Sequence, residues 1–269
     1  MEFKDKIYDG EYEVTEVQIN NEGQIFRGLL YFPPKRFKKP YPLVIYFHGF
    51  PELSTLAEII KRYRYLLNLG YSLCSFNFRG YRISEGRISI KSQISDALKL
   101  LEFVKLMSEK KFFDIDNINI LSCDFGSFIA LLLCSKTKII NKLILISPIL
   151  DLKKHIYGND FPRALSYINR FLPGYIKGIE NIEEFIEFTK KELNDNQFQI
   201  SDFINKLKLK DLKVILGEND KITPITEVNH IFQNFNTNYE FYVINGADHD
   251  FIDDEELEQL NKEIIKYLT

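Results

Sequence analysis

Short apolar runs alternate along the chain with longer stretches in which apolar residues recur every three or four positions. Residues 43–47 and 143–146 are apolar without a break, which is typical of strands buried on both faces of a sheet. Residues 92–107 instead place Ile94, Ala97 and further apolar residues on one face, as an amphipathic helix does. This alternation predicts a mostly parallel central sheet with helices on both faces.

The individual elements follow from the same two patterns. Strands are expected at residues 11–20, 24–32, 43–47, 72–78, 118–121, 143–146, 213–216 and 241–244. Helices are expected near residues 56–69, 92–107, 125–134 and 254–267. Asn21, Glu22 and Gly23 separate the first two strands, which therefore predict an antiparallel hairpin at the sheet edge.

One long segment, residues 151–209, departs from the alternation. It has helical patterns and many charges, and it contains no convincing strand. We expect a helical cap insertion over the C-terminal ends of the strands, where open parallel sheets bind their ligands. The predicted domains are a core of residues 1–150 and 210–269 and a cap of residues 151–209.

Composition narrows the function classes. The net charge of −3 leaves no basic excess for nucleic acid, and no apolar run approaches the roughly 20 residues of a membrane span. The first residues do not resemble a signal peptide. Cys74, Cys123 and Cys134 fit neither disulfide nor zinc spacing, as expected of buried thiols in the cytoplasm. The sequence gives no indication of the oligomeric state.

The turn at Asp124 carries the most specific chemistry. An apolar strand runs into Ser122-Cys123-Asp124-Phe125-Gly126, and an apolar helix leaves it. This is the layout of the G-x-S-x-G nucleophile elbow, with aspartate in the place of serine. The backbone amide of Phe125 opens the helix, where free N–H groups favour negative charge.

Three further turns also follow predicted strands. The glycine turn after residues 43–47 exposes the amide of Phe50, which we expect to face an oxyanion together with the amide of Phe125. Asp220 lies in a loop suited to a carboxylate that orients a histidine. His249 follows the last strand and is the candidate base.

In chain order, Asp124, Asp220 and His249 resemble the nucleophile, acid and histidine of the α/β-hydrolase superfamily. Residues 78–86 are similar to that family's R-G-x-G-x-S-x-G turn, and residues 148–151 resemble the entry to the cap of feruloyl-esterase-like and serine-aminopeptidase-like members. The resemblance covers nearly the whole chain. It implies an α/β-hydrolase fold with a helical cap, acting on a small-molecule substrate without a metal or an organic cofactor.

The aspartate at the elbow resembles epoxide hydrolases and haloalkane dehalogenases, and His48-Gly49-Phe50-Pro51-Glu52 resembles the former. Both subgroups typically carry a tryptophan beside the nucleophile; this chain has none, and Phe125 takes that place. The resemblance implies an ester between Asp124 and the substrate, hydrolysed by water that His249 activates. In epoxide hydrolases, cap tyrosines donate a proton. The predicted cap contains three candidates, and no pair is selected by spacing: Tyr157, Tyr167 and Tyr175.

Two other functions stay open. One is a carboxylic-ester hydrolase of the feruloyl-esterase type, and the other is a non-catalytic homologue that binds a ligand or partner. For an active enzyme we expect an ionised Asp124 at neutral pH and a raised pKa for His249 between two carboxylates. The remaining histidines have other expected roles: His48 holds its loop through hydrogen bonds, and His155 and His230 lie at the surface.

Overall fold

The computed structural model describes residues 7–209, 211–233, 235 and 237–269, whose strands form one nine-stranded sheet in the order β1-β2-β3-β5-β4-β6-β7-β8-β9. Strands β1 to β3 are antiparallel to their neighbours, whereas β4 to β9 pair in parallel. The strand bounds are β1 Ile7–Asp9, β2 Tyr12–Asn21, β3 Gln24–Tyr31, β4 Tyr41–Phe47, β5 Ser72–Asn77, β6 Phe113–Cys123, β7 Ile140–Ile146, β8 Asp211–Gly217 and β9 Asn238–Ile244.

Every strand expected from the sequence is present, and the hairpin is confirmed by the pairing of Asn21 with Gln24. Its position at the very edge was wrong, because β1 lies outside β2. With only three residues, β1 is too short to show a periodic pattern. Strand β6 begins earlier than expected, at Phe113, which pairs with Tyr41 of β4 before a register shift; regular pairing resumes at Ile118.

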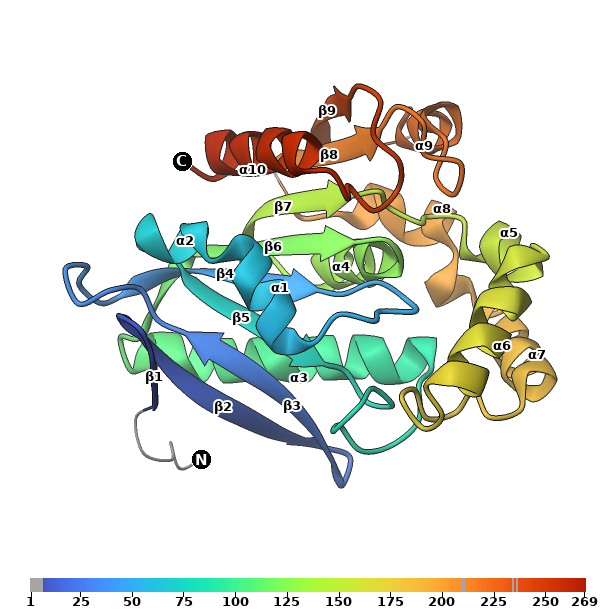
Figure 1. Cartoon of the computed structure of the whole chain (residues 1–269), viewed down its shortest axis with the longest axis horizontal. Helices are drawn as coiled ribbons and strands as arrows, with labels where there is room; N and C mark the ends of the chain where they lie inside the picture. The colour runs from blue at the N-terminus through green and yellow to red at the C-terminus, as the bar shows by residue number, and fades with distance from the viewer. Residues whose placement is uncertain (1–6, 210, 234, 236) are drawn as a thin grey trace.

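Helices cover both faces of the sheet (Figure 1). Along β4, Leu43, Ile45 and Phe47 pack into one apolar cluster, and the alternate residues Val44 and Tyr46 pack into the other, as the pleat requires. The first cluster is covered by α3 (Ile90–Glu109), α4 (Phe125–Lys136) and α9 (Ile225–Phe232); the second is covered by α1 (Leu56–Tyr63), α2 (Tyr65–Asn68) and α10 (Asp254–Leu268).

Two of these helices differ from expectation. The helix expected at residues 56–69 is divided at Arg64 into α1 and α2. Helix α9 was not expected; it is only eight residues long and starts directly after Pro224. Both differences concern elements of eight residues or fewer, for which the apolar period is hard to recognise.

The segment between β7 and β8 is helical, as expected. It contains α5 (Leu152–Tyr157), α6 (Asp160–Phe171), α7 (Ile182–Leu193), η1 (Asn196–Phe198), α8 (Ile200–Phe203) and η2 (Ile204–Lys206). In Figure 1 the arrowheads of β6 and β7 point toward α5 and α6, so these helices lie beyond the C-terminal ends of the strands. Helix α8 packs instead on the face of the sheet that α3 and α4 cover, with Phe203 against Phe128 of α4. The domain bounds stay a prediction, and residues 1–6 and 210 of the predicted core lie outside the described residues.

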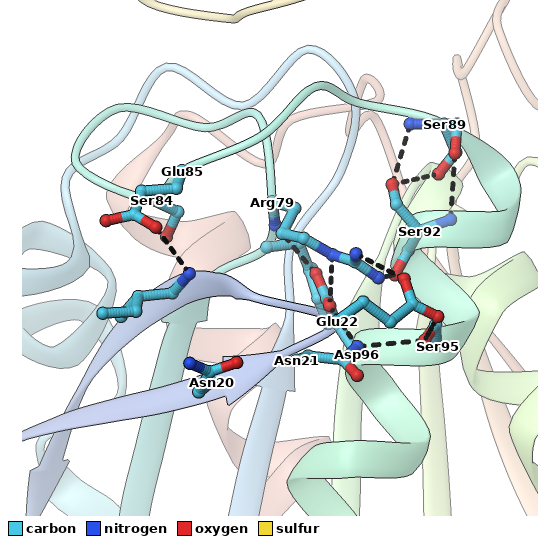
Figure 2. A network of polar contacts seen from close by, with 12 residues as sticks. Asn20, Asn21, Glu22, Arg79, Ser84, Glu85, Ser89, Ser92, Ser95 and Asp96 are labelled. Atoms are coloured by element: carbon cyan, nitrogen blue, oxygen red, sulfur yellow. Dashed lines mark hydrogen bonds and ion pairs between the residues drawn. The ribbon is translucent and has the colours of Figure 1, made fainter.

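The turn after β5 is held by a buried ion pair (Figure 2). Arg79 donates from Nε to Asp96 of α3 at 2.7 Å, and its backbone N–H donates to the same carboxylate at 2.9 Å. Glu22, in the β2–β3 turn, accepts from another guanidinium nitrogen at 2.7 Å. Asn21 donates to Asp96 at 2.8 Å. One arginine therefore ties the hairpin, the β5 exit and α3 together.

Candidate active site

Asp124 occupies a sharp turn between β6 and α4. Its φ of +50° is unusual for a residue with a side chain, and its N–H donates to the carbonyl of Ile146 at 3.0 Å. Two residues later, a Cβ on Gly126 would lie 2.5 Å from the carbonyl oxygens of Phe47 and His48. Only glycine allows α4 to start so close to β4, and this close start sets the direction of the Asp124 side chain.

The two carboxylate oxygens of Asp124 have different surroundings. Oδ2 accepts the backbone N–H of Phe50 at 3.1 Å, and the amide of Phe125 lies close enough to lower the pKa of the carboxylate. Oδ1 is buried and has no hydrogen-bond partner within the described part of the chain. Burial raises the pKa of Asp124 to about 7, although the charge of His249 and the two amides oppose the rise. Our expectation of a fully ionised carboxylate at neutral pH was therefore wrong, because burial disfavours the charge.

The loop after β4 is shaped around that carboxylate. A Cβ on Gly49 would lie 2.6 Å from Asp124 Oδ2, so the loop approaches closely only because it has glycine there. The ring of His48 is buried, with Nδ1 2.9 Å from the carbonyl oxygen of Gly49. This contact confirms the structural role expected for His48. Tyr81 packs on the same ring, with the ring centroids 4.3 Å apart.

Asp220 and His249 form a close pair. Asp220 Oδ2 lies 2.8 Å from His249 Nδ1, and the backbone N–H of Thr223 donates to the other oxygen of Asp220 at 2.8 Å. Burial by itself raises the pKa of Asp220, but His249 and Thr223 outweigh it and hold the pKa at about 2. The β8 and β9 loops meet at Gly217, where a Cβ would strike the carbonyl oxygens of Ala247 and Asp248.

His249 responds to carboxylates on two sides. Burial lowers its pKa, but the hydrogen bond to Asp220 and the charges of Asp124, Asp220 and Asp250 outweigh burial and raise it. The direction agrees with the expectation from the sequence. Since the pKa of Asp124 is also raised, the two groups compete for one proton near neutral pH.

A cavity of about 500 Å³ opens above Asp124 and His249. Its walls combine loop residues of the core with residues of α5 and α6, and Asp220 lies behind His249. The polar and charged residues of the lining are Asp124, Asp151, Lys154, His155, Asp160, Lys221, Thr223, Glu227, His249 and Asp250. The predicted nucleophile, base and oxyanion loop therefore meet at one cavity beneath the helical segment.

The cap residues at the cavity are not those expected. Tyr157 and Tyr167 are more than half exposed, and Tyr175 donates its hydroxyl to the carbonyl of Leu53 at 2.6 Å; none of the three lines the cavity. His155 was expected at the surface but is mostly buried and lines it. The sequence did contain a signal for the position of His155. Residues 151, 154, 155 and 158, which line the cavity, are spaced as on one face of a helix that follows β7.

Across the described ranges, no helix is long and apolar enough to cross a membrane. Within the same ranges, no three histidine, cysteine or acidic side chains gather as metal ligands do.

A model of the family described as "alpha/beta hydrolase fold" matches residues 42–184. Among curated proteins, the chain is similar to the lysophosphatidylserine lipase ABHD12 of Danio rerio, with 25% identity over 71% of this chain and 46% of that protein. The Xenopus tropicalis protein of the same name is 28% identical over 50% of this chain and 34% of its own length. The chain thus spans less than half the length of these curated relatives.

Solved structures show the same fold. Est1E from Butyrivibrio proteoclasticus, with ferulic acid bound, has a TM-score of 0.70 at 18% identity and covers 94% of this chain and 99% of its own. An acetyl xylan esterase from Paenibacillus sp. R4 has a TM-score of 0.69 at 13% identity, over 99% of this chain and 90% of its own.

Proposed function

Because the chain belongs to the alpha/beta hydrolase fold family, we propose that it hydrolyses a small neutral epoxide, with Asp124 as nucleophile, His249 as base and Asp220 as the residue that orients His249. The observation that carries the proposal is the unequal setting of the Asp124 oxygens. Oδ2 accepts from the Phe50 amide, whereas Oδ1 has no hydrogen-bond partner among the described residues, and Asp124 lines the cavity. A free and a fixed oxygen suit a carboxylate that attacks an alkyl carbon.

In the first step Asp124 Oδ1 attacks a ring carbon of the epoxide. A carbon–oxygen bond forms to Asp124, the ring carbon–oxygen bond breaks, and its electron pair stays on the departing oxygen. Water in the open cavity protonates that oxygen. The product is an ester of Asp124, and one negative charge has disappeared beside His249. Since that charge raised the pKa of His249, the ring then releases its proton to solvent, which neutralises the hydroxide left by the first proton transfer.

In the second step neutral His249 removes a proton from water, and the water oxygen attacks the carboxyl carbon of Asp124. The oxyanion forms on Oδ2, which already accepts from Phe50. As the intermediate collapses, the ester bond breaks and the diol oxygen takes the proton from His249. The remaining carboxyl proton then returns to the Asp124–His249 pair. The sum is epoxide plus water to diol, with the enzyme regenerated.

Phe125, which follows Asp124, has no side-chain N–H to offer a halide or an epoxide oxygen. A donor for the epoxide oxygen must therefore come from elsewhere in the cavity. The charge of the cavity favours a neutral substrate. Besides Asp124, the lining has four carboxylates, Asp151, Asp160, Glu227 and Asp250, against two lysines. The phosphate-containing substrate class in the relatives' name would meet repulsion here.

Ester hydrolysis, the first alternative, is disfavoured by the contents of the oxyanion hole. In a serine esterase the two amides bind the carbonyl oxygen of the substrate. Here Asp124 Oδ2 accepts from the Phe50 amide itself. A carboxylate attacking an ester would also form a labile anhydride. The same filled hole favours the second alternative, a homologue that has lost its nucleophile and binds a ligand.

Isotope labelling of Asp124 tests the proposal. Multiple turnovers of styrene oxide in H₂¹⁸O should place ¹⁸O in the peptide that contains Asp124, because water attacks its carboxyl carbon. The His249→Gln variant should accumulate an adduct, visible by intact mass, and Asp124→Asn should give neither adduct nor turnover. If the wild type turns over no epoxide, halide or ester, whereas Asp124→Ser hydrolyses p-nitrophenyl acetate, the lost-nucleophile alternative is correct.

A further inference from the structure

His155 lies between two hollows of the site. It lines the large cavity together with Asp124 and His249, and it also lines a small apolar hollow of about 20 Å³. Its ring packs edge-on against Phe161 of α6, with the ring centroids 5.2 Å apart, and Phe161 packs in turn on Phe50. Two aromatic contacts thus fix a polar ring at the cavity wall.

No hydrogen bond joins the ring of His155 to another described residue, and its nitrogens are not among the buried polar atoms that lack a partner, so they are open to the cavity that His155 lines. Burial, together with the charge of His249, lowers the pKa of His155 to about 4. The ring is therefore neutral at neutral pH, with one N–H donor and one acceptor nitrogen. Its donor and its acceptor are therefore available to a group that enters the cavity.

The other side-chain donors of the cavity are already engaged or exposed. Lys154 donates to Glu227 at 2.6 Å, and Thr223 donates its hydroxyl to Asp220. His249 Nδ1 is paired with Asp220, and Lys221 is exposed. With the cap tyrosines outside the lining, two side-chain donors of the described residues remain at the cavity: His155, and Nε2 of His249, which must act on water in the second step.

We propose that the neutral ring of His155 donates a hydrogen bond to the epoxide oxygen while Asp124 attacks the carbon, a role that rests on the proposed function. The hydrogen bond stabilises the negative charge that grows on this oxygen as the ring bond breaks. His155 keeps its proton throughout; cavity water supplies the proton for the alkoxide. A neutral imidazole is suited to this task because it donates without giving up its proton.

The test measures how fast Asp124 is alkylated in the His249→Gln background, by intact mass, with two electrophiles. Styrene oxide develops charge on a strongly basic oxygen, whereas benzyl bromide loses bromide, a weak base whose departure depends much less on a hydrogen-bond donor. His155→Phe keeps the aromatic contact with Phe161 and removes the N–H. It should slow alkylation by styrene oxide roughly 100-fold and leave alkylation by benzyl bromide nearly unchanged.

Two variants complete the comparison. His155→Gln restores an N–H and should recover part of the rate with styrene oxide. Tyr157→Phe, on the same helix but outside the cavity, should change neither rate. Equal slowing with both electrophiles, or no slowing with either, overturns the role of His155. If styrene oxide gives no adduct while His155 is intact, the proposed function and this inference fall together; the benzyl bromide rate reports whether each variant is folded.

Discussion

Asp124 combines two properties that oppose each other. Burial raises its pKa to about 7 and so disfavours the nucleophilic form, whereas the Phe50 amide and the charge of His249 favour that form. The balance places the carboxylate near the point of half-ionisation at neutral pH. A slightly drier cavity would leave Asp124 protonated and unreactive.

The pH dependence of epoxide hydrolysis should report this balance. Only the carboxylate form of Asp124 attacks, and its folded-state pKa is raised to about 7. We therefore expect kcat/KM for styrene oxide to rise as the pH increases from 5 and to level off above 7. Stopped-flow or product assays at constant ionic strength measure the profile. A rate that stays constant from pH 5 to pH 8 contradicts the assignment.

For single residues, the sequence predicts where a side chain lies better than how buried it is or how its pKa is shifted. The structure brings Asp124, Asp220 and His249 together because each follows a strand, and strand ends of a parallel sheet meet at one edge. The pKa of Asp124 and the burial of His155 depend on helices that are far away in the chain. No local pattern contains that information.

The elements around the site depend on Arg79, which joins the β2–β3 turn to α3 (Figure 2). This ion pair lies on the side of the sheet that supports α4, and both Arg79 and Asp96 are buried. A buried pair of this kind fixes the geometry more than it adds net stability, because desolvation offsets much of the attraction.

Removing one partner of the pair should destabilise the fold strongly. Asp96→Ala leaves the guanidinium of Arg79 buried, with Glu22 as its remaining charged partner among the described residues. We expect the free energy of unfolding to fall by about 3–5 kcal/mol, measured by urea denaturation. Glu102→Ala is the control: it breaks the exposed Lys99–Glu102 pair on the same helix and should have no measurable effect. Equal effects of the two substitutions would refute the structural role of Asp96.

Element bounds illustrate what periodicity can and cannot predict. The long helices α3 and α10 begin within two residues of their expected starts. The division at Arg64 and the short helix α9 were missed, because tertiary packing decides whether a segment of eight residues is helical.

The protein has a net charge of −3, and the charged residues that line its cavity are also negative on balance. The carboxylates of Asp151, Asp160, Glu227 and Asp250 outnumber the lysines of the lining. Charge near a site mainly affects which ligands approach and bind.

Matched substrates should reveal this selectivity. At low salt, we expect kcat/KM for glycidyl phosphate to be lower than for a neutral glycidyl ether by roughly tenfold or more, with the gap narrowing as salt is added. Asp160→Asn, which removes one carboxylate from the lining, should raise the rate with the anionic substrate. Glu258→Gln, an exposed change outside the lining on α10, should not. A phosphate substrate that reacts as fast as the neutral one contradicts the electrostatic argument.

The helical segment leaves the sheet after β7 and returns at β8, and these two strands pair directly, with Ile144 beside Lys213. Because β7 and β8 pair directly, the register of the sheet does not depend on the length of the helical segment between them. An insertion, a deletion or an exchanged helix there would reshape the entrance while the strand ends that carry Asp124 and Asp220 stay fixed. Evolution, or a laboratory library, can therefore explore new substrates in α5 and α6, while the part around Phe203 stays packed against α4.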